Sequence, residues 1–369
     1  MKKEKLRAIL RLQKTKAVGD ILAKKLIIAT GDVRQIFKEK PATLLKINGI
    51  GTHVVNQLFD NQYKNLAEKE VEYIQQNNIA TSYFLDDDYP KNLQQCIDAP
   101  ILFFKDGNIN LENERIISIV GTRNMTSYGR DFCKELIKDL TTYNPIIVSG
   151  FAYGVDICAH KEAIKNKLQT IAVLAHGFEQ IYPKTHKKYI NQVNENGGFI
   201  TEFWHDEDPL REHFLQRNRI VAGISQATII IESAEKGGSL VTADIANSYS
   251  RDVFAVSGRT TDLYSKGCNE LIKNHKAALL TSVEDVAKML NWDLDSKQKK
   301  SKTIQKQLFV ELNTNEQKVY NYLLKNGKQL LDIIAIECNL PVYKLAPLLL
   351  QLEMKGVVQP LPGKLFEVV

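Results

Sequence analysis

The sequence predicts an α/β protein: a doubly wound, mostly parallel sheet with a helical domain before it and a winged helix after it. Seven short β-favouring runs predict the sheet, because each is followed by a turn and then by a segment with helical periodicity. The runs are almost wholly apolar, which is typical of strands that helices bury on both faces. They span residues 116–120, 146–148, 170–174, 199–201, 227–231, 253–256 and 277–280.

Composition bounds the class of protein. The chain has 369 residues, which favours two or three domains. Its 49 Lys and Arg exceed its 43 Asp and Glu by 6, an excess too small to establish a nucleic-acid partner by itself. The five cysteines show no CxxC spacing, so neither a disulfide framework nor a zinc site is expected. No apolar run approaches the roughly 20 residues that cross a bilayer, so we expect a cytoplasmic protein without a membrane span.

Residues 1–80 are expected to form a helical domain. Within it, Gly49-Ile50-Gly51 precedes a helical pattern, and a degenerate copy of this turn lies around Gly19. The pair resembles the helix-hairpin-helix motif of SAM-like domains. Backbone amides at such a turn can hold a DNA phosphate without reading sequence. A module that only packs helices together is the alternative, and it is favoured because the motif is short.

The last part of the chain indicates a linker and a winged helix. Residues 291–312 form a basic linker, and residues 313–369 follow as the winged-helix domain. Its first helix is predicted to start at Thr314, with Gln317 completing a capping-box spacing.

The recognition-helix position of this domain is poor in positive charge. Residues 342–355 hold only Lys344 and Lys355 as cations, whereas a DNA-reading helix needs several. A surface that binds protein is therefore favoured over one that reads DNA.

Glycine-rich and polar residues gather where the predicted strands end, which is where doubly wound sheets bind ligands. Gly121 and Gly150 permit close backbone approach, and Arg123 offers a guanidinium fork suited to phosphate. Tyr182 and Lys184 couple an aromatic face with a cation, as in sites that stack a base beside its phosphate. The two arginines and the asparagine at 217–219 directly precede an apolar run, so this cationic cluster is predicted to open a helix and to suit a nucleic-acid backbone. The candidate residues are Gly121, Arg123, Ser149, Gly150, Tyr182, Lys184, Arg217, Asn218, Arg219, Gly238 and Ser239.

Several chemistries are not indicated. No G-x-G-x-x-G opens the first helix of the sheet domain and no P-loop occurs, so no nucleotide cofactor is predicted. His176 and Glu232 do not make a metal site. Asp156 and His160 form an i, i+4 pair, which we interpret as a helix-surface or capping contact and not as catalytic machinery. We therefore predict no catalytic residues, no metal and no enzymatic activity.

Six ordered motifs in the sheet region resemble those of the DNA-processing protein A (DprA/Smf) family. They are Gly121-Thr122-Arg123 with Ser127-Tyr128-Gly129, Ser149-Gly150-Phe151-Ala152-Tyr153-Gly154-Val155-Asp156, Tyr182-Pro183, Arg217-Asn218-Arg219-Ile220, Gly238-Ser239-Leu240-Val241-Thr242-Ala243 and Gly267-Cys268-Asn269-Glu270-Leu271-Ile272. The resemblance implies an extended Rossmann core over residues 81–290. It also implies a non-enzymatic homodimer that binds single-stranded DNA, protects incoming DNA and loads RecA during natural transformation, with single-strand-binding protein as a further candidate partner.

The resemblance also implies a role for most of the candidate residues. Arg123 would line a basic DNA pocket, and Ser149 with Gly150 would form its backbone floor. Tyr182 and Lys184 would lie on a loop at its edge, and residues 217–219 would be the helix-opening cluster. Three positions depart from the family pattern: Ser257 replaces a proline, His176 replaces a glycine, and Glu179 places an anion beside the Tyr182 loop.

Two other classes of protein stay open. The turn at 237–242 resembles the phosphate loop of nucleotide phosphoribohydrolases of the lysine-decarboxylase-like group, although Asp244 is offset from the carboxylate those enzymes need. A pure scaffold is the other alternative, in which the helical and winged-helix domains bind proteins and the core only dimerises.

Overall fold

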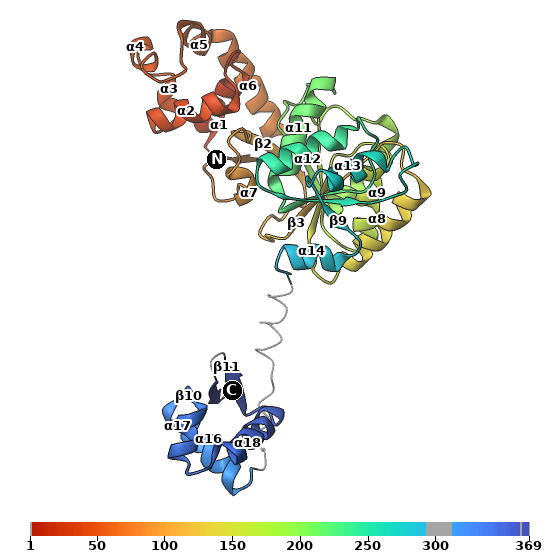
Figure 1. Cartoon of the computed structure of the whole chain (residues 1–369). Helices are drawn as coiled ribbons and strands as arrows, with labels where there is room; N and C mark the ends of the chain where they lie inside the picture. The colour runs from red at the N-terminus through yellow and green to blue at the C-terminus, as the bar shows by residue number, and fades with distance from the viewer. Residues whose placement is uncertain (1, 293–311, 362–363, 369) are drawn as a thin grey trace. The chain divides into compact units, whose positions relative to one another are not determined.

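The computed structural model describes residues 2–292, 312–361 and 364–368 (Figure 1). The chain divides into two compact units, residues 1–294 and 295–369, and each unit has its own hydrophobic core. The predicted linker at 291–312 lies almost wholly outside the described residues.

A nine-stranded sheet organises the first unit, in the order β1-β2-β6-β5-β4-β3-β7-β8-β9. Strands from β6 to β9 in this order pair in parallel, whereas β2 pairs antiparallel with both β6 and β1. The predicted doubly wound, mostly parallel sheet is therefore confirmed, and all seven predicted runs are strands. The strands are β1 (Ala80–Tyr83), β2 (Leu102–Gly107), β3 (Ile116–Val120), β4 (Ile146–Ser149), β5 (Thr170–Val173), β6 (Gly197–Thr201), β7 (Ala227–Ile230), β8 (Asp252–Val256) and β9 (Ala278–Leu280).

Helices cover both faces of this sheet, with α8 and α9 on one side and α11 and α12 on the other (Figure 1). Successive side chains of β3 point to opposite faces, and both faces are covered. Ile117 and Ile119 are buried against α8 and α9, while Ser118 Oγ donates to the Val221 carbonyl of α11 at 2.6 Å. The helices that follow β1 in this unit are α7 (Lys91–Gln94), α8 (Ser127–Leu140), α9 (Val155–Lys165), η1 (Lys184–Tyr189), α10 (Ile190–Glu195), α11 (Arg211–Ile224), α12 (Gly238–Ser248), α13 (Lys266–Lys273) and α14 (Val283–Met289).

The chain reverses its direction of travel across the sheet next to β3. Strands β4, β5 and β6 extend from one side of β3, and β7, β8 and β9 extend from the other. The segments that leave the carboxyl ends of β3 and β7 therefore diverge, and a crevice opens at this topological switch point.

The N-terminal helices belong to the same compact unit as the sheet. Buried Ile9, Leu10 and Leu12 of α1 share one core with Phe103 and Phe104 of β2. Gln13 Nε2 also donates to the Leu102 carbonyl at 3.1 Å. The six helices are α1 (Lys3–Lys14), α2 (Asp20–Thr30), α3 (Val33–Ile36), α4 (Pro41–Leu44), α5 (Thr52–Leu58) and α6 (Asn61–Gln76).

The second unit is a winged helix, as predicted. Among the described residues of this unit, three helices accompany a small sheet with the strand order β10-β12-β11. The elements are α16 (Thr314–Asn326), β10 (Gln329–Leu330), α17 (Leu331–Glu337), α18 (Val342–Met354), β11 (Val358–Leu361) and β12 (Leu365–Val368). The predicted helix start at Thr314 is confirmed, but the capping box lies one residue earlier than predicted. Asn313 caps the helix and Glu316 bonds back to it, because the Asn313 carboxamide reaches the amides of the first turn.

Within the part of the chain that the structure describes, no single helix is long and apolar enough to cross a membrane. Helices α17 and α18 reach the required length and hydropathy only as a pair, and the pair is bent by 108° at the break between them.

Candidate functional site

A pocket of about 670 Å³, here called the strand-end pocket, occupies the switch-point crevice. Its walls come from the segments after β3, β4 and β7 and from one face of α11. The lining includes Gly121, Arg123, Gly150, Asp156, Arg211, Phe214, Arg217, Asn218, Lys236, Gly238 and Ser239. Four of these side chains are cationic and one is a carboxylate, so the pocket favours an anionic ligand.

Phe214 organises the pocket. Its ring centroid lies 5.5 Å from the Arg123 guanidinium and 6.0 Å from that of Arg217, within cation–π range. The Tyr182 ring meets it edge to face, with centroids 5.4 Å apart. An aromatic ring close to two guanidinium groups can stack a nucleobase while the arginines bind the adjoining phosphates.

Arg217 lies at the base of the pocket and is 5% exposed. Its Nη1 donates to the Gly150 carbonyl at 2.9 Å and also to the Val173 carbonyl, whereas its Nε has no hydrogen-bond partner among the described residues. Burial lowers the pKa of Arg217 to about 10, so the group stays charged at neutral pH. A buried cation at the base of the pocket raises the local positive potential and so favours an anionic ligand.

Gly150 leaves room for this guanidinium. A Cβ at this position would lie 2.5 Å from both Arg217 Nη1 and Asp156 Oδ2. Any side chain there would therefore displace one of the two charged groups.

Asp156 and His160 are not the surface pair that the sequence suggested. Both are buried, at 7% and 0% exposure, and each has its own partner. Asp156 Oδ2 accepts from the Ala152 amide at 3.3 Å, and burial raises the pKa of this carboxyl against the opposing effect of Arg217. His160 Nδ1 lies 2.7 Å from Thr170 Oγ1, and burial lowers the pKa of the imidazole to about 3. The prediction of a helix-surface contact is wrong because α9 turns this face toward the sheet.

The start of α12 forms another wall. A Cβ on Gly238 would meet nothing within 4 Å, so the first backbone turn of this helix faces open space. Ser239 Oγ donates to Ser233 Oγ at 2.9 Å, which fixes the loop before the helix. Asp244, which is offset from the carboxylate that a phosphoribohydrolase would need, does not line the pocket and pairs with Lys276 at 2.9 Å.

The prediction that residues 217–219 open a helix is wrong. Helix α11 begins six residues earlier, at Arg211, since Pro209 and the extended Leu210 precede it and Glu212 occupies its first turn. Successive residues on a helix point about 100° apart. Arg217 and Asn218 therefore face the pocket, whereas Arg219 points away from it.

The other candidate residues are only partly brought together. Ser149 is fully buried beneath the pocket, where its Oγ donates to the Ile119 carbonyl at 2.6 Å. Tyr182 reaches the pocket through Phe214, but Lys184 at the start of η1 does not line it. The predicted convergence of Arg123, Lys184, Arg217 and Arg219 thus holds for two of the four cations. Ser257, His176 and Glu179 also lie outside the lining.

The lining residues that were missed include Arg211, Phe214 and Lys236. Phe214 precedes Arg217 by three residues, so the two share one face of a helix. A correct start for α11 would have placed Phe214 and Arg211 beside the arginine.

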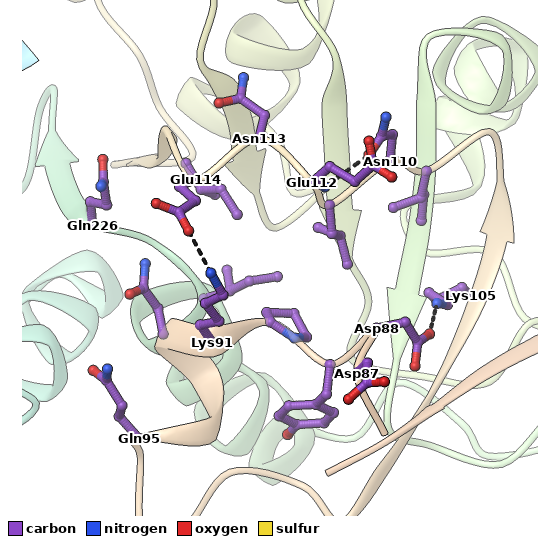
Figure 2. A pocket seen from close by; sticks show the side chains of 17 residues that line it. Asp87, Asp88, Lys91, Gln95, Lys105, Asn110, Glu112, Asn113, Glu114 and Gln226 are labelled. Atoms are coloured by element: carbon purple, nitrogen blue, oxygen red, sulfur yellow. Dashed lines mark hydrogen bonds and ion pairs between the residues drawn. The ribbon is translucent and has the colours of Figure 1, made fainter. Parts of the chain in front are cut away.

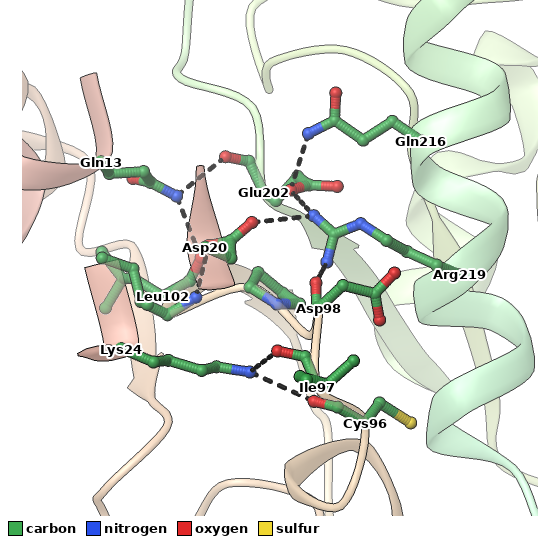
Figure 3. A network of polar contacts seen from close by, with 12 residues as sticks. Gln13, Asp20, Lys24, Cys96, Ile97, Asp98, Leu102, Glu202, Gln216 and Arg219 are labelled. Carbon is green, nitrogen blue, oxygen red and sulfur yellow. Dashed lines mark hydrogen bonds and ion pairs between the residues drawn. The ribbon is translucent and has the colours of Figure 1, made fainter. Parts of the chain in front are cut away.

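Arg219 instead joins the N-terminal helices to the sheet (Figure 3). Its guanidinium contacts Asp20 at 3.1 Å, the Glu202 carboxylate and the Asp98 carbonyl. Gln216 Nε2 donates to the same Glu202 carboxylate at 3.1 Å. Burial alone would lower the pKa of Arg219, but the two carboxylates outweigh this effect and raise it. Arg219 is therefore a structural ion-pair residue.

The network predicts a pH dependence of stability. One guanidinium serves two carboxylates, the buried Glu202 and the partly buried Asp20, and burial raises the pKa of Glu202 to about 7 from the ordinary 4.5. The folded state then binds this proton more tightly than the unfolded state, so stability falls as pH rises between these two values. We expect Glu202 to remove up to about 3 kcal/mol of unfolding free energy between pH 4.5 and 7.5. Urea titrations at several pH values should show a smaller fall for Glu202→Gln, and parallel profiles for the two proteins would contradict the assignment.

A second cavity of about 810 Å³ lies at the opposite edge of the sheet, beside the start of β3 (Figure 2). Its lining holds Asp87, Asp88, Glu112 and Glu114. Its two lysines pair with carboxylates: Lys91 with Glu114 and Lys105 with Asp88, both at 2.6 Å. This lining is unsuited to a polyanion. No group of His, Cys, Asp or Glu side chains among the described residues could hold a metal ion.

The fold and the strand-end pocket define an extended doubly wound α/β protein with a cationic, aromatic site at its switch point. Residues 80–291 match the family model described as DNA recombination-mediator protein A, and residues 311–364 match that of the DprA winged helix domain. The chain therefore belongs to the DNA processing protein A (DprA/Smf) family, as its motifs indicated.

Its relatives agree with this assignment. DNA processing protein DprA of Streptococcus pneumoniae is 38% identical over 202 residues, which cover 55% of this chain and 71% of that protein. The crystal structure of DprA from the same species matches with a TM-score of 0.67 and 30% identity, covering 78% of this chain and 97% of that one. A structure of Helicobacter pylori DprA, described for its single-stranded DNA binding mode, matches with a TM-score of 0.53 and 29% identity over 58% of this chain and 96% of that one.

Proposed function

We propose that this protein binds single-stranded DNA in the strand-end pocket. The observation that carries the proposal is that Arg123 and Arg217 both lie within 6.0 Å of the Phe214 ring, since this places an aromatic ring and two phosphate-binding groups together. The Helicobacter pylori relative, whose structure is described for its single-stranded DNA binding mode, supports single-stranded DNA as the ligand.

The same geometry favours single strands without sequence preference. Stacking on Phe214 is open to any base once that base is unpaired, and arginine contacts to phosphate carry no sequence information. We therefore expect oligo(dT) to bind more tightly than a duplex of equal length. Equal affinity for the two, measured by fluorescence anisotropy, would contradict this selectivity.

We further propose that the protein acts without catalysis, as a homodimer that loads RecA onto single-stranded DNA during natural transformation. Family membership supports this role. The test is RecA filament formation on DNA precoated with single-strand-binding protein, with and without this protein. The expected result is a shorter lag. Tight DNA binding with an unchanged lag would contradict loading and leave the DNA-binding proposal standing.

Substitution of Gly150 by alanine should weaken DNA binding although it removes no side chain that binds DNA. The new methyl group would overlap the Arg217 guanidinium and the Asp156 carboxylate, so Arg217 must leave its position. We expect roughly a tenfold loss of oligo(dT) affinity, about 1.4 kcal/mol, as for one charge-assisted hydrogen bond. Gly19→Ala is the matched control, because its Cβ also has free space and Gly19 does not line the strand-end pocket. Equal affinity of Gly150→Ala and wild type would show that Arg217 is not a ligand.

A further inference from the structure

A second groove continues the strand-end pocket over the helices α8 and α9. This α8–α9 groove encloses about 780 Å³. Arg123 and Asn124 line both it and the strand-end pocket, so the two are contiguous. Its remaining lining is Met125, Arg130, Lys134, Tyr153, Gly154, Ile157, Cys158, Lys161 and Glu162.

The charges of this groove are strongly one-sided. Arg123, Arg130, Lys134 and Lys161 face a single carboxylate, Glu162. That carboxylate is itself paired with Lys165, at 3.7 Å.

The spacing of the cations on α8 also points to an anion. Arg130 and Lys134 are one turn apart on the same face, and like charges at this spacing destabilise an isolated helix. Lys134 has only a 3.5 Å contact with Asp131, and no ion pair within the described residues involves Arg123 or Arg130. A ligand with several negative charges would relieve this repulsion.

We propose that the α8–α9 groove binds the backbone of the same DNA strand that occupies the strand-end pocket, with Arg123 at the junction. This inference rests on the proposed function and extends it from one pocket to a continuous path. The phosphodiester chain is the ligand that fits, because it presents several negative charges to the several cations of the groove. Tyr153 adds an aromatic surface that is 43% exposed, with its hydroxyl held 3.0 Å from Thr185 Oγ1.

Cys158 provides a reporter within the groove. It is the one cysteine of the five that is not buried, so alkylation of the native protein should select it. The Cys133 thiol lowers the pKa of Cys158, and Lys134 and Arg130 add to this effect, which favours reaction with iodoacetamide.

The test compares oligo(dT) of about 6 nucleotides, enough for the strand-end pocket, with oligo(dT) of about 20 nucleotides. The full-length protein should bind the longer strand at least tenfold more tightly. The longer strand should also slow alkylation of Cys158 severalfold at saturation, whereas the shorter strand should not.

The variant Arg130→Ala/Lys134→Ala should remove most of the gain from the longer strand and leave the shorter strand unaffected. Its salt dependence for the longer strand should fall by about 1.4 in log–log slope, at about 0.7 for each phosphate that is no longer neutralised. The control Lys138→Ala/Lys288→Ala removes two exposed charges from α8 and α14 outside the groove and should resemble wild type. Because all four side chains are on the surface side of these helices, the variants should fold.

The outcomes separate the two proposals. If both strands bind equally, or if the groove variant and the control behave alike, the groove is not part of the path, although the pocket still binds DNA. If no oligonucleotide of either length binds, the proposed function fails and this inference fails with it.

Discussion

Replacing Arg123 and Arg217 together by alanine should lower the affinity for oligo(dT) by at least about 100-fold. A charge-assisted hydrogen bond to phosphate contributes about 1 to 3 kcal/mol, and the two guanidinium groups flank the same aromatic ring. The salt dependence should also weaken by about 0.7 in log–log slope for each phosphate that the variant no longer neutralises. Fluorescence anisotropy with labelled oligo(dT) at several salt concentrations measures both quantities.

Two further variants make this result interpretable. Arg123→Ala alone removes an exposed side chain, so it should lose about tenfold in affinity with no change in stability. Lys64→Ala/Lys69→Ala removes two exposed charges from α6, outside the pocket, and should bind like wild type. An equal loss in this control would mean that net charge, and not the pocket, governs binding.

Replacing Arg219 by methionine should destabilise the protein by about 3 to 5 kcal/mol without any direct effect on DNA binding. The substitution would leave Glu202 and Asp20 buried without their counterion, which is the costly way to break a buried ion pair. Lys276→Met, which breaks the exposed pair with Asp244, should cost less than about 0.5 kcal/mol. Urea unfolding followed by circular dichroism gives both values.

The Arg219 variant also tests the assignment of this residue as structural. If Arg219→Met is as stable as wild type but binds oligo(dT) poorly, Arg219 is a DNA ligand after all. We expect the reverse: a less stable protein whose folded fraction binds DNA normally, because the side chain points toward α2 and β6.

The repeated strand-turn-helix pattern made the parallel part of the sheet predictable. The strands β1 and β2 were not predicted. They are antiparallel and no long helix follows either of them, so they do not show the strand-turn-helix pattern. The position of the site was predictable for the same reason as the sheet: Arg123 and Gly150 follow strands whose carboxyl ends share one edge.

The direction of individual side chains was not predictable. Arg217 and Arg219 are two residues apart and chemically alike, yet the rotation of α11 sends one into the pocket and the other into the protein. Asp20 lies 199 residues before Arg219, so no local pattern could pair them. The sequence therefore predicts the region of the strand-end pocket. Only the fold shows which side chains line it.

The most direct test of the strand-end pocket is a crystal structure of the full-length protein with oligo(dT). We predict a thymine stacked on Phe214, one phosphate within hydrogen-bond distance of Arg123 and another group of the strand bonded to Arg217. A strand bound elsewhere, with the ring of Phe214 and both guanidinium groups free of DNA, would contradict the account.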